Sequence, residues 1–222
     1  MLGIAPIDAT AVVPVVEAAN ADDVPVVTID ETAEEGEIYT YIASPNDVGG
    51  KLAGEWLVEE LGGKGQLAVV EGESGSSTNN ARLDGLKEAL EGSEIEIVAT
   101  APGDWLTDKA FQTARDMLTA NPEVDAFFGI NDTMAVGIAQ AVGQAGKRKD
   151  VKIIGYNGDP IAFDAIRNGT MDATVAQDPK RMGELLIENA IAAADGQAAA
   201  EETINVPVEV VDTQNIETVG GK

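Results

Sequence analysis

Short apolar runs alternate along the chain with longer segments in which apolar residues recur every three to four positions. The runs rich in Val, Ile and Phe predict buried strands, and the three-to-four spacing predicts amphipathic helices. The predicted strands are 2–7, 24–30, 38–43, 66–72, 95–102, 124–130, 151–158, 172–177 and 204–211. The predicted helices are 9–22, 46–61, 79–91, 107–120, 132–145, 159–168 and 179–195.

This alternation predicts an α/β fold with mainly parallel sheets and helices on both faces. The strands are continuous apolar runs, which is typical of sheets covered on both sides. Pro14 is expected in the first turn of its helix, where a missing N–H costs little. Asp132 and Asp178 each stand between a strand and a helix, so we interpret them as N-caps.

Nearly every predicted strand ends on a polar or aromatic side chain. In an open α/β sheet, ligands bind beyond the carboxyl ends of the strands. The side chains at this edge are Asp30, Glu31, Ser44, Arg82 (after the loop GESGSS), Trp105, Asn131, Asn157 and Gln177. Each alone has an ordinary explanation as a cap, an ion pair or a core residue, but together they predict a ligand site.

The chemistry of this set is that of a sugar site. A carboxylate such as Asp30 accepts protons from hydroxyls, the fork of Arg82 donates several hydrogen bonds, and amides do both. A hydroxylated ring needs this mixture because each hydroxyl is at once a donor and an acceptor. The flat indole of Trp105 can cover the apolar C–H face of the ring.

Composition narrows the chemistry further. The chain contains no Cys and no His, which excludes thiol catalysis, Cys/His zinc sites and Ser-His nucleophile pairs. The candidate site holds no group expected to act as a general base near pH 7. We therefore expect a binding protein and not an enzyme, with no metal ion and no cofactor.

Charge and hydropathy limit the classes of binding partner that we expect. Acidic residues outnumber basic ones 39 to 14, for a formal net charge of −25. Phosphate recognition needs the opposite sign, so nucleic acid is not an expected partner. No apolar run approaches the roughly 18 residues that suggest a membrane-spanning helix, so no membrane insertion is expected. The start MLGIAPIDATAVV lacks the basic region and cleavage pattern of a signal peptide.

Several segments resemble the ribose-binding protein family, the substrate-binding proteins of sugar-importing ABC transporters. They are VPVVTID, YIASPNDVGGKLAGEWL, NDTMAVG, IIGYNG and ATVAQDPKRMGELLIE. The resemblance implies a periplasmic-binding-protein type I fold, with two α/β domains joined by three crossovers. It also implies that a sugar is trapped between the domains by hinge closure and delivered to an ABC permease, in the periplasm or at the cell surface. The domains would be 1–43 plus 178–203, and 44–177 plus 204–222.

The resemblance also carries over to single positions. Four residues match sugar-contacting positions of the family by type, and Trp105 stands where the family commonly has a stacking aromatic ring. The four are Asp30, Arg82, Asn131 and Gln177. Glu31 and Ser44 are secondary candidates.

Three positions depart from the ribose binders. Asn157 stands where they carry Asp, Glu31 where they carry Arg, and Ala5 where they carry a sugar-contacting Asn. The change at Glu31 disfavours an anionic sugar at that end of the site. These departures argue against ribose itself and leave a pentose, a hexose or a polyol as the expected class.

Family members begin with two βα units before the strand matched by 2–7, so about 60 residues of the family pattern have no counterpart here. We therefore expect the first domain to be incomplete, with uncovered apolar helix faces and an exposed sheet edge. Two other functions use the same fold, namely the effector domain of a LacI-type repressor and a sugar-sensing receptor domain. The segment ATVAQDPKRMG, which stands where a repressor-like LTTV is expected, argues against the repressor.

The acidic, lysine-poor composition predicts a dependence on salt. Repulsion among surface carboxylates is screened as ionic strength rises. We expect the melting temperature to increase between low salt and molar KCl, as measured by thermal unfolding across a KCl series. A melting temperature that stays level or falls over that series contradicts adaptation to high salt.

Overall fold

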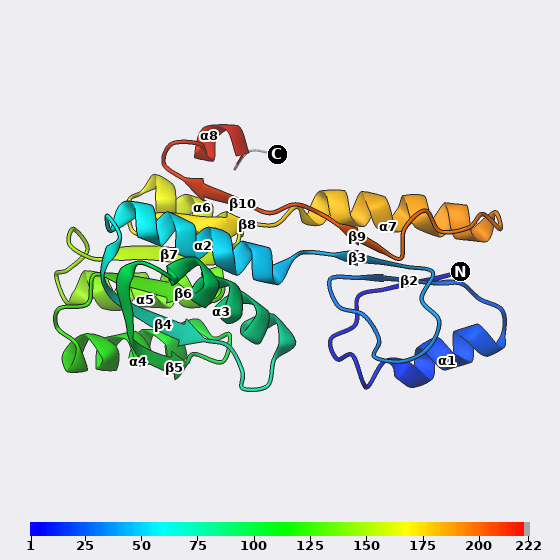
Figure 1. Ribbon diagram of the computed structural model, residues 1–222, viewed down its shortest axis with the longest axis horizontal. Helices are drawn as coiled ribbons and strands as arrows, with labels where there is room; N and C mark the ends of the chain where they lie inside the picture. The colour runs from blue at the N-terminus through cyan, green and yellow to red at the C-terminus, as the bar shows by residue number, and fades with distance from the viewer. Residues whose placement is uncertain (220–222) are drawn as a thin grey trace. The chain divides into compact units, whose positions relative to one another are not determined.

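The computed structural model describes residues 1–219 and divides the chain into two units, shown in Figure 1. Unit 1 comprises Met1–Pro45 and Gln177–Pro207, and unit 2 comprises Asn46–Ala176 and the segment that begins at Val208. The chain passes from one unit to the other after Pro45, Ala176 and Pro207. In residues 1–219, no helix combines the length and the apolar character needed to cross a membrane.

Unit 1 is built on a parallel sheet of four strands in the order β1-β2-β3-β9. The strands are β1 (Leu2–Ile4), β2 (Val26–Ile29), β3 (Thr40–Ala43) and β9 (Thr203–Asn205). Two helices lie on opposite sides of this sheet in Figure 1, α1 (Val13–Ala21) and α7 (Pro179–Ala194). The core between α7 and the sheet is small and centres on Val27, Ile42, Met182 and Val206.

Unit 2 is built on a sheet of six strands in the order β10-β8-β7-β6-β4-β5, and all are parallel except β10. The strands are β4 (Lys64–Glu71), β5 (Glu94–Pro102), β6 (Ala126–Gly129), β7 (Lys152–Asn157), β8 (Ala173–Ala176) and β10 (Glu209–Asp212). The helices are α2 (Asn46–Glu60), α3 (Ser77–Leu90), α4 (Thr107–Ala120), α5 (Asp132–Gln144), α6 (Pro160–Arg167) and α8 (Ile216–Val219).

The helices of unit 2 form two layers. Helices α2 and α3 pack closely against each other on one face, while α5 packs against both α4 and α6 on the other. This arrangement follows from right-handed connections between parallel strands. Strands β6, β7 and β8 are buried along most of their length, and β4 is buried over Leu67–Val70, as the continuous apolar runs predict.

The predicted α/β fold is confirmed. The main errors of the prediction concern the ends of strands and one helix cap. The single strand predicted at 204–211 is two strands in different sheets, β9 and β10. Pro207 lies between them and has no N–H to offer a ladder. The first strand ends at Ile4 instead of residue 7, just ahead of Pro6.

Two of the three capping predictions are confirmed. Pro14 lies in the first turn of α1, and Asp178 caps α7 by accepting a hydrogen bond from the Arg181 amide at 2.8 Å. The prediction for Asp132 is wrong, because the N-cap of α5 is the preceding residue, Asn131. Asp132 is already inside the helix, and its side chain is free to point elsewhere.

Unit 1 leaves several large apolar side chains uncovered. On α7, Ile187 and Ile191 are 59% and 58% exposed, and Val15 on α1 is 51% exposed. β1 is the outermost strand of its sheet. The expectation of uncovered apolar helix faces in this part of the chain is therefore met.

Helices α2 and α3 approach each other closely through glycines. A Cβ atom at Gly85 would lie 1.9 Å from the carbonyl oxygen of Asp47, and one at Gly50 would lie 2.0 Å from the carbonyl oxygen of Arg82. Both distances are far shorter than a van der Waals contact. Glycine at these positions lets the backbones touch and holds Arg82, in the second turn of α3, against the start of α2.

We predict that Gly85→Ala destabilises the protein by roughly 1–3 kcal/mol or more, because the added methyl group forces α2 and α3 apart. Chemical denaturation of the two proteins measures the difference. Gly143→Ala is the matched control, since Gly143 is also helical and nothing lies within 4 Å of the added Cβ. The control should be neutral or slightly stabilising, because alanine is the better helix former. Equal losses in the two variants would contradict the close-packing account.

Candidate functional site

The carboxyl ends of β4, β5, β6 and β7 carry the predicted residues of unit 2. Trp105 lies in the loop between β5 and α4, and both it and Asp104 have positive φ angles of 62° and 49°. Such angles are uncommon for residues other than glycine and mark strain held in place by the surroundings. The indole of Trp105 lies on Gly72, just past β4, where a Cβ atom would come within 2.1 Å of the ring. The structure therefore holds this partly buried ring in one place.

Asn131 lies two residues beyond β6 and is 9% exposed. Its Oδ1 atom accepts a hydrogen bond from the Met134 amide at 2.8 Å, which caps α5. The predicted division of labour, with Asn131 contacting ligand and Asp132 capping, is thus wrong in its second half. A ligand contact by Asn131 stays a prediction, and the amide nitrogen is the atom left to donate.

Asn157 is the last residue of β7 and has a φ angle of 121°. Gly158, which follows, has a φ angle of 76°. This pair turns the backbone sharply between β7 and α6 and places the partly buried Asn157 at the same edge as Asn131.

Arg82 is 5% exposed and bonded on several sides. Its Nη1 atom donates to the carbonyl oxygen of Ile130 at 2.7 Å, and its Nε atom donates to Oδ1 of Asn46 at 2.9 Å. Its guanidinium carbon also lies 3.6 Å from the centroid of the Tyr156 ring. Sequence reasoning missed Asn46 and Tyr156. Alternation along the strand could have pointed to Tyr156. It stands one residue before Asn157 in a predicted strand, so its side chain faces the opposite side of the sheet, where a helix must cover it.

The segments that carry these four residues are all bonded to the segment 130–134 or are part of it. Arg82 reaches Ile130 directly, and Asn131 belongs to the segment. The Trp105 loop joins it through Thr107, whose hydroxyl donates to the Thr133 carbonyl at 3.1 Å. The loop that follows Asn157 joins it through the Asp159 amide, which donates to Asp132 at 2.7 Å. Unit 2 therefore gathers two amides, a guanidinium and an indole around one strand-to-helix junction.

Asp132, which follows the candidate residue Asn131, has a raised pKa. Burial raises the pKa of this carboxyl from 3.8 to about 7, against the opposing effect of its hydrogen bonds. The residue is fully buried. Because a general base must reach the proton it removes, Asp132 does not indicate catalysis.

Unit 1 carries the remaining predicted residues, and its acidic pair lies just past β2. Asp30 is exposed, has a φ angle of 68°, and accepts a hydrogen bond on its carbonyl from the Tyr41 hydroxyl at 2.8 Å. Burial, followed by the charges of Glu31 and Asp30, raises the pKa of Tyr41 to about 12. Glu31 accepts a hydrogen bond from the Thr32 amide at 3.0 Å. This edge of unit 1 therefore has a negative potential.

Ser44 follows β3, and Gln177 begins the second segment of unit 1. Within residues 1–219, the Ser44 hydroxyl and the Gln177 amide nitrogen are buried without a hydrogen-bond partner. Buried polar side-chain atoms are paired in the large majority of cases. The two groups are therefore available to a polar ligand or to water.

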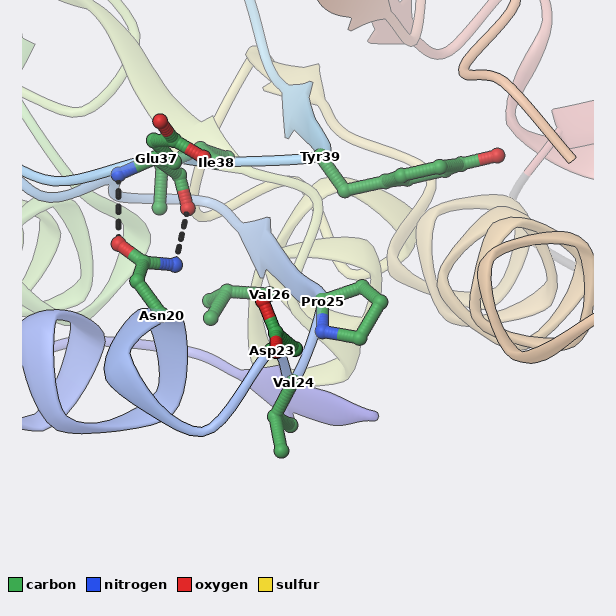
Figure 2. Close-up of a pocket in the computed structure, with 8 residues that line it drawn as sticks. All are labelled: Asn20, Asp23, Val24, Pro25, Val26, Glu37, Ile38 and Tyr39. Carbon is green, nitrogen blue, oxygen red and sulfur yellow. Dashed lines mark hydrogen bonds between the residues drawn. The ribbon is translucent and has the colours of Figure 1, made fainter. Parts of the chain in front are cut away.

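A hollow of about 290 Å³ lies elsewhere on unit 1, at the amino ends of β2 and β3 (Figure 2). Its lining includes Asp23, Pro25 and Tyr39, and none of the predicted ligand residues. One side of it is closed by Asn20, whose side chain makes two hydrogen bonds to the backbone of Glu37, at 2.8 and 2.9 Å. The hollow is thus at the opposite end of β2 from Asp30 and is separate from the candidate site. In the described part of the chain, no three or more acidic side chains cluster as a metal site would require.

A family profile described as the periplasmic binding protein domain matches residues 1–198. The chain belongs to this family. The ribose import binding protein of Escherichia coli strain K12 is 35% identical over 190 residues, which are 86% of this chain and 64% of that protein. The chain thus spans a little less than two thirds of the length of that relative.

Solved structures of solute-binding proteins have the same fold as this chain. An ABC transporter periplasmic solute-binding protein from Actinobacillus succinogenes, with bound D-allose, matches with a TM-score of 0.92 and 30% identity, over 97% of this chain and 79% of that one. A solute-binding protein from Bacillus halodurans, with bound myo-inositol, matches with a TM-score of 0.88 and 28% identity, over 97% and 75%. The relatives are transport proteins that bind substrates and are not enzymes.

We predict that Arg82→Lys destabilises the protein by about 1–3 kcal/mol, because a compact ammonium cannot serve Asn46, Ile130 and the Tyr156 ring together. Chemical denaturation measures the loss. Arg181→Lys is the control, since Arg181 is exposed and pairs with Glu184 and Glu188 at the surface of α7. Its substitution should change stability by less than about 0.5 kcal/mol. If Arg82→Lys is as mild as the control, Arg82 does not support the fold in the way its contacts indicate.

Proposed function

We propose that the protein is an extracytoplasmic substrate-binding protein that captures a monosaccharide or polyol and delivers it to the permease of an ABC importer. The observation that carries the proposal is the convergence of Arg82, Trp105, Asn131 and Asn157 on the segment 130–134. Unit 1 would add Asp30 and Gln177, with Glu31 and Ser44 as secondary contacts.

The chemistry of these groups supports a sugar over other small molecules. The amide nitrogen of Asn131 can donate a hydrogen bond, and the amide of Asn157 can both donate and accept. The carboxylate of Asp30 accepts, so that neighbouring hydroxyls of a ring can each find a partner. Trp105 presents a flat apolar surface, and stacking on it removes the C–H face of the ring from water.

The electrostatics favour a neutral ligand. Asp30 and Glu31 both contribute to the raised pKa of Tyr41, so both negative charges act at this edge of unit 1. The net charge of the chain is −25. An anionic sugar would meet repulsion at this edge, so neutral pentoses, hexoses and polyols are the proposed class. Relatives solved with D-allose and myo-inositol are consistent with that class.

Import is preferred over the two other functions that share the fold. A repressor effector domain and a sensory receptor domain would bind a sugar with a similar site. The curated relatives include import binding proteins for ribose, and this likeness favours transport.

The proposal predicts that at least one neutral sugar or polyol stabilises the protein. A ligand present at about 100 times its dissociation constant adds about 2.7 kcal/mol to the free energy of unfolding, which a thermal-shift screen detects. The screen covers pentoses, hexoses and polyols, with titration calorimetry on any that raise the melting temperature. If none of them does, the proposed function is wrong for this chain.

Repeating the binding measurement on two variants tests whether the sugar binds at the candidate site. Trp105→Ala should weaken binding about ten-fold or more, because burying an aromatic face contributes roughly 1.5–3 kcal/mol. Trp56→Phe is the matched control: Trp56 lies on α2 and its ring nitrogen donates to Asp212 at 3.3 Å. The control should bind as the wild type does, and an equal loss in both variants would place the ligand elsewhere.

A further inference from the structure

Asp132 joins three elements of unit 2 through one buried carboxylate. Its Oδ1 atom accepts a hydrogen bond from the Thr174 hydroxyl on β8 at 2.6 Å. Its Oδ2 atom accepts a hydrogen bond from the Asp159 amide at 2.7 Å. The first turn of α5, the loop between β7 and α6, and β8 are thereby tied to a single side chain.

The sequence makes room for this carboxylate. A Cβ atom at Gly155, on β7, would lie 2.2 Å from Oδ1 of Asp132, so only glycine fits beneath it. The cap of α5 is supplied by Asn131. Asp132 is therefore not needed by its own helix, and its side chain serves the neighbouring loop.

The loop that Asp132 holds is the one that carries Asn157. Asn157 and Gly158 have φ angles of 121° and 76°, and a positive φ is unfavourable for a residue such as Asn unless its surroundings enforce it. The amide bonded to the carboxylate belongs to Asp159, two residues after Asn157. A second tie is weaker, from the Gly158 amide to the Thr174 hydroxyl at 3.4 Å.

We propose that Asp132 is a positioning residue for ligand binding, whose ionised carboxylate holds the loop 157–159 so that the Asn157 amide faces the ligand. The proposal rests on the proposed function, since it concerns how one candidate ligand residue is placed. Asp132 itself is fully buried and does not touch the ligand.

The hold on the loop depends on protonation. The ionised carboxylate accepts hydrogen bonds at both oxygens, and such charge-assisted bonds are about twice as strong as neutral ones. A protonated carboxyl keeps one full acceptor and turns the other oxygen into a donor. The titratable group that faces Asp132 is Asp159, while β7 and β8 present the uncharged Gly155 and Thr174. Since the pKa of Asp132 is about 7, both forms are populated near neutral pH.

The pH dependence of positioning is opposite to that of folding stability. The pKa of Asp132 is higher in the folded protein than the ordinary 3.8, so this group favours folding most at low pH. Its contribution is lost as pH rises from about 4 to about 7. The hold on the loop, by contrast, strengthens as pH rises through about 7. A residue with only a structural role would not make binding improve while stability declines.

The test compares the wild type with Asp132→Asn, in which the amide mimics the protonated carboxyl. Calorimetry with the sugar that stabilises the protein most is run at about pH 6 and about pH 8. The wild type should bind about five-fold more tightly at the higher pH, from the difference between charged and neutral hydrogen bonds. Asp132→Asn should bind equally at both, with the wild-type affinity of the lower pH.

Asp125→Asn is the matched control, since the Asp125 carboxylate also accepts a backbone hydrogen bond, from Gln66 at 2.8 Å, but lies ahead of β6 at the other edge of the sheet. This variant should show the same change in sugar affinity between the two pH values as the wild type. Thr174→Val and Thr174→Ser provide a second pair, should Asp132→Asn fold poorly. Valine removes the hydroxyl that stabilises the ionised form and should move the transition to higher pH, and serine should restore it.

A ligand-free measurement separates this proposal from the proposed function. Deuterium exchange of the Gly158 and Asp159 amides, corrected for the intrinsic effect of pH, should slow from about pH 6 to about pH 8 in the wild type and not in Asp132→Asn. If exchange behaves so and no sugar binds, the hold on the loop is supported and the proposed function fails. If the wild type shows no such slowing, or Asp132→Asn retains it, the positioning role is overturned.

Discussion

In unit 2, the helices that follow parallel strands, α3, α4, α5 and α6, begin at the carboxyl edge of the sheet. The first N–H groups of such a helix have no partner within the helix. At α3 and α5 a side chain at this edge supplies such a partner. Asn131 does so for the Met134 amide, and Ser76 does so for the Asn79 amide. The same edge is where a ligand meets an α/β protein. Asn131 uses only its Oδ1 atom for the backbone, so its amide nitrogen is left for the ligand contact that we propose.

Contacts within unit 2 fix several of the candidate side chains in place. Arg82 is held by Asn46, by the Ile130 carbonyl and by the ring of Tyr156. The indole of Trp105 lies directly on Gly72, where a Cβ atom would collide with the ring. Binding groups held by their neighbours lose little conformational entropy on binding. The strained backbone at Trp105 and Asn157 belongs to the same arrangement, because strain of this kind persists only where packing enforces it.

Unit 1 presents a different balance. Its core is smaller, and Ile187 and Ile191 on α7 are largely exposed. Its candidate residues include two neighbouring carboxylates and two buried polar groups, those of Ser44 and Gln177. Unit 2 offers donors and an aromatic surface, and unit 1 adds acceptors and a negative potential. The groups of each unit, taken by itself, suit a neutral, hydroxyl-rich molecule, since hydroxyls can donate to the carboxylates of unit 1 and can accept from the amides of unit 2.

The sequence by itself determined the α/β fold and the set of candidate residues, because apolar periodicity and strand ends are local properties. It also determined the caps at Pro14 and Asp178, which depend on residues within one turn. The division of labour between Asn131 and Asp132 was decided only by the tertiary structure. Both side chains can cap a helix, so local sequence does not distinguish them.

What separates the two residues lies far along the chain. Gly155 leaves the space for the Asp132 carboxylate, and Thr174 and the Asp159 amide donate to it. The raised pKa of Asp132 has the same origin, since burial is a property of the packed sheet and helices and not of the residue. Similarly, the split of 204–211 into β9 and β10 depended on which sheet had an edge to offer on each side of Pro207. Contacts between segments far apart in the chain decided the role of Asp132 and the split of 204–211. A local sequence pattern cannot predict such contacts.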